Sequence, residues 1–167
     1  MKKILIISFC FFCLFGYAQR AEVTKTPEIK WLSIEKAQEY SAKYKMNIMI
    51  YFYRNNCDYC KLMKEQTLKD PEVIKFINEN FYPVYLDART KDTIVFNKKK
   101  YYNQQPTEHG HTFRHDLFGK LYTELKNNPG YIFPTTIIID HNYNKVNQLT
   151  GIQKKLQFLR NLKKSVD

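Results

Sequence analysis

Residues 47–61 read Asn-Ile-Met-Ile-Tyr-Phe-Tyr-Arg-Asn-Asn-Cys-Asp-Tyr-Cys-Lys. After Asn47, the run over 47–53 is apolar and aromatic without a break, which is typical of a strand buried on both faces in the middle of a sheet. Cys57 and Cys60 follow, three positions apart, where a helical stretch over 61–68 opens. The stretch therefore predicts a central strand, a short turn, and a helix with two sulfur atoms at its start.

The segments on either side predict further helices and a second strand. Ser33 is a suitable N-cap for a helix that runs to about Lys45. Asp70 caps another helix, with Pro71 at its first position. A strand over 81–86 comes next. This alternation of helices and strands predicts a layered α/β domain.

The sequence pattern of the second half is irregular between residues 88 and 130 and regular after that segment. Between residues 88 and 130 we expect two short strands over 93–96 and 100–103, a loop over 107–111, and a helix over 112–125. The chain is expected to end with a hairpin and an amphipathic helix, in the order strand 135–140, strand 145–150, helix 152–164.

The N-terminus has the three-part pattern of a secretory signal peptide. Two lysines precede an apolar run over 4–15, and the small residues Gly16 and Ala18 favour cleavage after Ala18. The alternative, a buried N-terminal helix, is less consistent with this pattern, and the run is shorter than the roughly 20 residues that span a bilayer. We expect a signal peptide over 1–18, a linker over 19–30, and a periplasmic or secreted domain over 31–167 with no stable membrane insertion.

The composition excludes few partners. The formal net charge of the 167-residue chain is +11, and two of its lysines lie in the predicted signal peptide. The remaining lysines are scattered and form no long basic stripe, so we interpret the charge as solvation and weak steering. We expect no nucleic-acid binding and a monomer.

Cysteine usage is more informative. Cys10 and Cys13 would leave with the signal peptide, so Cys57 and Cys60 would be the cysteines of the exported domain. A bridge between them closes a loop too small to stabilise the fold much. Zinc usually takes four ligands, and the residues that could complete a set with these cysteines are His109, His111, His115 and His141. We expect no bound metal and no cofactor other than the redox-active disulfide; copper(I) carriage is an alternative.

The position of the pair suggests the role of each sulfur. A helix start has unpaired backbone N–H groups and the positive end of the helix dipole, and both favour a thiolate. Cys57 is therefore the expected nucleophile, and Cys60 the thiol that resolves a mixed disulfide. The negative charge of Asp58 disfavours the thiolate of Cys57, which favours a reducing or isomerising protein over a strong oxidant.

Together these motifs resemble the thioredoxin superfamily over about residues 31–166, in particular its exported disulfide-reductase and interchange members. The matching motifs are Cys57-Asp58-Tyr59-Cys60-Lys61, Asp70-Pro71-Glu72-Val73 and Phe133-Pro134-Thr135-Thr136. The resemblance implies an α/β thioredoxin fold, with a central mixed sheet flanked by helices and an insertion over about 88–130. It also implies that Pro134 is cis and faces the sulfurs, so that Phe133, Pro134, Asp58 and Tyr59 bind substrate.

One departure from the family concerns proton transfer. Tyr51 stands where thioredoxin has a buried aspartate that is thought to shuttle protons. Proton transfer would then use water, Lys61 or His115. The expected function is reduction or isomerisation of disulfides in exported envelope proteins, with electrons from an unidentified envelope thiol donor. The alternatives are a non-catalytic peptide-binding module and a copper carrier that uses the cysteine pair.

Overall fold

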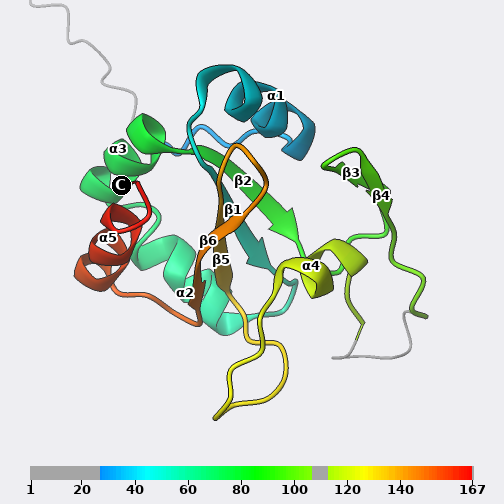
Figure 1. The fold of residues 1–167 in the computed structure, drawn as a ribbon. Helices are drawn as coiled ribbons and strands as arrows, with labels where there is room; N and C mark the ends of the chain where they lie inside the picture. Colours follow the sequence, from blue (N-terminus) through cyan, green and yellow to red (C-terminus); the bar gives the residue numbers. More distant parts are fainter. Residues whose placement is uncertain (1–26, 107–112, 167) are drawn as a thin grey trace, which may run out of the picture.

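A mixed four-stranded sheet forms the centre of the computed structural model, which describes residues 27–106 and 113–166 (Figure 1). Its strands are β1 (Ile48–Tyr53), β2 (Tyr82–Asp87), β5 (Thr135–Ile139) and β6 (Lys145–Thr150), in the order β2-β1-β5-β6. β2 is parallel to β1, whereas β5 is antiparallel to both of its neighbours. The predicted signal peptide, residues 19–26 of the predicted linker, and the predicted loop over 107–111 lie outside the described residues.

β1 is buried on both faces, as its sequence predicts. Ile48, Ile50 and Phe52 belong to the hydrophobic core on one side of the sheet, and Met49 and Tyr51 to the core on the other. All five side chains are at most 1% exposed. A strand with no solvated face has to lie between layers, which is why the sheet is covered on both sides.

Helices cover both faces of the sheet (Figure 1). One side carries α2 (Asp58–Gln66), α3 (Pro71–Asn80) and α5 (Lys155–Lys163), and the other carries α1 (Ile34–Tyr44) and α4 (Asp116–Leu121). The two predicted caps are confirmed, because the side chains of Ser33 and Asp70 accept backbone N–H groups at the starts of α1 and α3. In the part of the chain that the structure describes, no helix is long and apolar enough to cross a membrane.

The segment after β2 first forms the small predicted hairpin, β3 (Ile94–Phe96) with β4 (Lys99–Tyr101). Its turn residues Asn97 and Lys98 both have positive φ, of 48° and 62°. Gln38 of α1 fixes the hairpin, since its side-chain amide donates to the Val95 carbonyl and accepts from the Asn97 N–H. The hairpin therefore lies against α1 and extends the domain to one side.

α4 is much shorter than the predicted helix over 112–125. It begins at Asp116, because the His115 ring caps it, and it ends at Leu121. Beyond that point tertiary contacts replace helical ones: Lys145 donates to the Leu121 carbonyl, and Gln148 accepts from the Thr123 N–H. The chain then becomes extended and reaches the edge of the sheet instead of continuing the helix.

The predicted end of the domain needs one further correction. The last helix, α5, starts at Lys155 rather than at Ile152, and Leu156, which its helical spacing with Leu159 and Leu162 predicts to point inward, is 73% exposed. Phe158 occupies the core instead, together with Leu159 and Leu162.

Candidate active site

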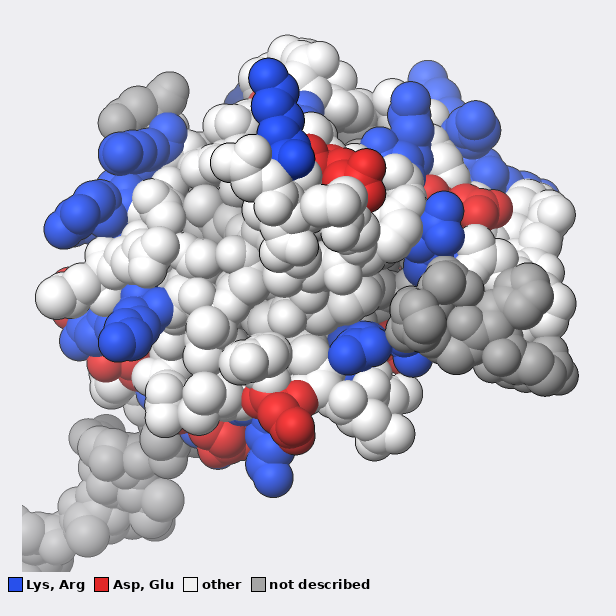
Figure 2. All heavy atoms as spheres, turned by 90° about the horizontal axis from the view of Figure 1, so that it is seen from below, with Lys and Arg blue, Asp and Glu red and all other residues white. Residues whose placement is uncertain are grey.

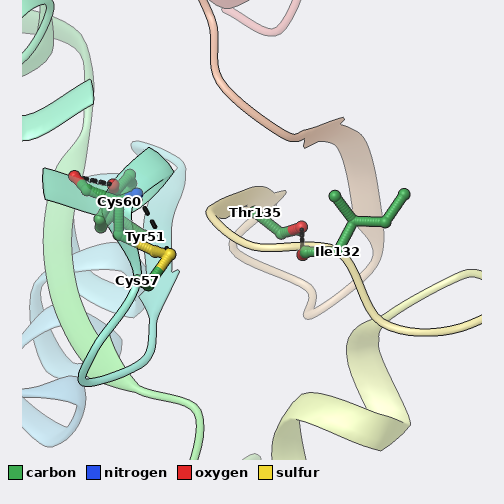
Figure 3. The surroundings of a disulfide bond; sticks show 5 residues. All are labelled: Tyr51, Cys57, Cys60, Ile132 and Thr135. Carbon is green, nitrogen blue, oxygen red and sulfur yellow. Dashed lines mark hydrogen bonds between the residues drawn. A yellow bond between two sulfur atoms is a disulfide. The ribbon is translucent and has the colours of Figure 1, made fainter. Parts of the chain in front are cut away.

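The two cysteines lie where β1 leads into α2. Cys57 is the N-cap residue of α2, and its Sγ accepts the Cys60 N–H at 3.1 Å. The two sulfurs are joined in a disulfide, with the Cα atoms 5.2 Å apart (Figure 3). Cys57 is partly exposed, whereas Cys60 is 6% exposed. Cys57 is therefore the sulfur that an incoming group can reach.

The segment that leads into β5 lies across from the disulfide (Figure 3). Its Phe133–Pro134 peptide bond is cis. The Thr135 hydroxyl donates to the Ile132 carbonyl at 2.7 Å, and the Gly151 N–H donates to the Pro134 carbonyl at 2.8 Å. These bonds hold the segment in place beside the cysteines.

A cleft of about 780 Å³ lies beside Cys57. Three of the other predicted site residues line it: Asp58, Tyr59 and Phe133. Pro134 is buried and does not contribute to the lining. The residues that the sequence reasoning missed are Arg54, Asn56, Arg114, Gly130 and Tyr131. They come from the turn before Cys57 and from the irregular segment around α4, which carry no motif that could have identified them.

Aromatic rings build the wall of the cleft opposite the cysteines. Phe118 of α4 is fully buried and lies 5.0 Å from Phe133 and 5.4 Å from Tyr131, between ring centroids. Arg54 lies over the Phe133 ring at 5.8 Å, and Arg114 over the Tyr131 ring at 4.4 Å. Seen from below, the molecule has a largely uncharged centre with Lys and Arg side chains spread around it (Figure 2).

A second, more polar cleft of about 480 Å³ reaches the disulfide from another side. It is lined by both cysteines and by Lys61, which the sequence reasoning singled out for proton transfer. Its other polar lining residues are Tyr53, Arg54, Asn55, Asn56, Asp58, Lys64, Glu65 and Tyr85. Through this cleft Cys60 contacts a polar environment that is separate from the first cleft.

Tyr51 lies behind the pair and is fully buried. Its hydroxyl donates to the Cys60 carbonyl at 3.3 Å, and its ring stacks on Tyr85 with centroids 5.4 Å apart. Burial, with a smaller contribution from Tyr85, raises the pKa of Tyr51 far above its usual value. The side chain therefore stays neutral at physiological pH and acts as a hydrogen-bond donor that positions α2.

His115 lines neither cleft. Its Nδ1 accepts the Leu117 N–H at 3.1 Å, so its Nε2 carries the proton and donates to the Asp92 carbonyl at 3.0 Å. Burial lowers the pKa of His115, and the Asp92 carbonyl only partly opposes this shift. The geometry gives His115 a capping role at α4 and does not support its predicted part in proton transfer.

The described ranges 27–106 and 113–166 contain no group of three His, Cys, Asp or Glu residues placed to hold a metal ion. Two of the histidines that could complete a set with the cysteines, His109 and His111, lie outside these ranges. What the described residues show at the site is a Cys57–Cys60 disulfide beside a cleft.

Comparison with known proteins identifies the family. The model of a family described as a thioredoxin-like domain matches residues 33–165, so the chain belongs to this family. A curated relative, an uncharacterized protein from Archaeoglobus fulgidus, is 29% identical over 65 residues, which are 39% of this chain and 51% of that protein. The chain therefore spans about half the length of this relative.

Solved structures with the same fold include an oxidoreductase, a thioredoxin and a putative disulphide-isomerase. The oxidoreductase DsbH has a TM-score of 0.57 at 20% identity, over 90% of this chain and 93% of that chain. A thioredoxin from Thermus thermophilus has a TM-score of 0.56 at 19% identity, over 81% and 85%. A putative disulphide-isomerase from Bacteroides thetaiotaomicron has a TM-score of 0.56 at 16% identity, over 86% and 97%. At these identities the likeness concerns the fold.

The fold predicted from the sequence is thus confirmed as thioredoxin-like, and it places a redox-capable Cys57–Cys60 pair at the start of α2. This arrangement supports thiol–disulfide oxidoreductase chemistry as the general class of activity.

Proposed function

We propose that the protein is an exported thiol–disulfide oxidoreductase that reduces or isomerises disulfides in envelope proteins. The observation that carries the proposal is the asymmetry of the pair. Cys57 is partly exposed at a helix start and lines a large cleft, while Cys60 is buried one turn further along α2. Such an arrangement suits one attacking and one resolving thiol.

In the reducing direction the protein starts as a dithiol. The Cys57 thiolate attacks one sulfur of a substrate disulfide, and the other substrate sulfur leaves as a thiolate and takes up a proton. The Cys60 thiolate then attacks Cys57, which releases the second substrate thiolate and leaves the Cys57–Cys60 disulfide seen in the structure. Two electrons have passed to the substrate. A thiol donor in the envelope then has to supply two more to the protein, which regenerates the Cys57–Cys60 dithiol.

The proton of Cys60 has to leave before its attack. We propose that it leaves through the second cleft, which both Cys60 and Lys61 line. Tyr51 is fully buried and already donates its hydrogen to the Cys60 carbonyl, so it is not the acceptor.

The direction of electron flow depends on how far the thiolate of Cys57 is stabilised. Asp58 is the first residue of α2 and also lines the cleft beside Cys57. A negative charge beside a thiolate destabilises the reduced form, which makes the protein a better reductant. Equilibration with glutathione measures the potential, and a value as high as about −120 mV, typical of strong oxidants, would rule out the reducing role.

Activity and trapping assays test the proposal itself. We expect the purified protein to accelerate insulin reduction by dithiothreitol and the Cys57→Ser variant to lose this activity. The Cys60→Ser variant should accumulate mixed disulfides on Cys57, since the resolving thiol is missing. A protein that forms its own disulfide but shows neither turnover nor mixed disulfides would instead be a peptide-binding module, and stoichiometric copper(I) after anaerobic purification would indicate a carrier.

The exported location has its own test. Mass spectrometry of the protein from an envelope fraction should give an N-terminus at Gln19, if cleavage follows Ala18. An intact Met1 on protein that stays with the cytosolic fraction would contradict export.

A further inference from the structure

The cleft beside Cys57 carries more positive than negative charge. Arg54 and Arg114 both line it, whereas Asp58 is the one carboxylate among its lining residues in the described part of the chain. Both guanidinium groups lie over aromatic rings, Phe133 and Tyr131, in the wall opposite the cysteines. This stacking holds the planar groups in place at the cleft.

Arg54 has unused hydrogen-bonding capacity. Its Nε is buried and has no hydrogen-bond partner among the residues that the structure describes. Among the same residues, Nε and Nη2 of Arg89 are also buried without a partner. A buried guanidinium N–H without an acceptor is costly, because it has lost water and gained nothing in exchange. The Nε of Arg54 is closed off from solvent, so a bound acceptor would meet Arg54 at the part of its side chain that lines the cleft.

The charge around Arg54 is also incompletely neutralised. Burial lowers the pKa of Arg89, and the nearby positive charge of Arg54 lowers it further. Asp87 opposes this shift, and its two oxygens accept from the Arg89 backbone N–H and the Asn55 side chain rather than from either guanidinium group. A further anion would therefore be stabilised beside Arg54.

We propose that the cleft selects substrate segments that carry an acidic side chain next to the reacting disulfide. The carboxylate of such a segment would bind between Arg54 and Arg114 while its disulfide meets Cys57. Arginine forms two parallel hydrogen bonds to a carboxylate, which fixes orientation as well as adding attraction. This inference rests on the proposed function and names the substrate class of the same site.

Three short cystine peptides test the proposal. They are identical except for the residue beside one cysteine, which is Glu, Gln or Lys. The reduced protein is mixed with each peptide, and the rate of exchange is divided by the rate of the same peptide with a small free thiol, which removes differences in the peptides' own reactivity. At low ionic strength we expect the Glu peptide to react roughly tenfold faster than the Lys peptide, as electrostatic steering allows. Added salt should shrink the ratio, because it screens the attraction.

Substitutions locate the effect. Arg54→Gln and Arg114→Gln should each bring the Glu-to-Lys ratio toward one. Arg160→Gln, which removes an exposed arginine from α5, is the matched control and should leave the ratio unchanged. The ratio is the readout, because it is insensitive to changes in the reactivity of Cys57.

The outcomes separate the two proposals. Equal rates for all three peptides, a preference for the Lys peptide, or a ratio that neither arginine variant changes would overturn the acidic-substrate proposal and leave the oxidoreductase intact. If no peptide reacts, the proposed function fails and this inference fails with it. The salt dependence in the unmodified protein keeps the proposal testable if a variant does not fold.

Discussion

Phe118 offers the sharpest test of how the fold supports the cleft. The side chain is fully buried, and its ring lies 4.9 Å from Phe52 of β1, 5.3 Å from Tyr122, 5.4 Å from Tyr131 and 5.0 Å from Phe133, between centroids. It therefore joins the central strand to the wall that faces the cysteines. Phe118→Ala removes a complete ring from a site that neighbouring rings surround.

The expected cost follows from the burial. Truncation of a buried phenylalanine to alanine removes about 3–5 kcal/mol of stability, because apolar area is lost and a cavity is left behind. The four ring contacts place Phe118 at the upper end of that range, since aromatic pairs add about 0.5–1.5 kcal/mol beyond their area. Phe118→Leu keeps most of the volume and should cost about 1–2 kcal/mol.

Urea denaturation followed by circular dichroism measures both variants, with the disulfide kept oxidised. Leu156→Ala is the control: Leu156 is 73% exposed on α5, so its loss should change the free energy of unfolding by less than about 0.5 kcal/mol. The Phe118→Leu variant, if folded, should raise KM for peptide substrates more than it lowers kcat, because it loosens Tyr131 and Phe133 and does not touch Cys57. A Phe118→Ala cost below about 1 kcal/mol would refute the bridging role.

Three further substitutions test single features of the site and its supports. Asp58→His should raise the redox potential by at least about 30 mV, a tenfold change in equilibrium constant, in equilibration with glutathione, because a positive charge stabilises the Cys57 thiolate. His115→Asn should flatten the pH dependence of stability between pH 7 and 5. Burial lowers the pKa of His115 in the folded state, so below about pH 6.5 the unfolded chain takes up a proton at this histidine more readily than the folded chain does. The stability of the unmodified protein therefore falls on acidification. Asp70→Ala should cost about 1 kcal/mol in urea at pH 7, since it removes the cap of α3 and the ion pair with Lys155.

Each of these has an outcome that contradicts it. An unchanged or lower potential in Asp58→His would show that the helix start, rather than residue 58, sets the potential. A slope of stability between pH 7 and 5 that is equal in His115→Asn and in the unmodified protein would mean that another group titrates there.

Although burial opposes the shift, Lys155 and two backbone N–H groups lower the pKa of Asp70. Its contribution should therefore persist down to about pH 4 and disappear below it, and a loss already at pH 6 would disagree.

Local signals account for most of what the sequence predicted. β1 is recognisable because six consecutive apolar and aromatic residues, 48–53, fit a strand with no solvated face. The starts of α1 and α3 are recognisable because Ser33 and Asp70 act on their own neighbours in sequence. The placement of Cys57 at a helix start has the same local cause.

The parts that the sequence did not predict depend on contacts between distant residues. The 112–125 pattern has helical spacing, yet α4 ends at Leu121. From that residue on, the side chains of Lys145 and Gln148 in β6 form hydrogen bonds with the backbone. Arg54 and Arg114 are separated by 60 positions and meet in one cleft because α4 packs on Phe133. Nothing at either position marks this in the sequence.

The two clefts explain why the site needs an asymmetric pair. Arg54, Asn56, Cys57 and Asp58 line both of them, so this short segment forms the ridge between them. In the proposed reaction a substrate occupies the first cleft while it is joined to Cys57. Cys60 still reaches the second cleft at that moment, and can lose its proton there without the substrate having to leave. A fold that presented both sulfurs to one cleft would let the bound substrate block the proton transfer on which its own release depends.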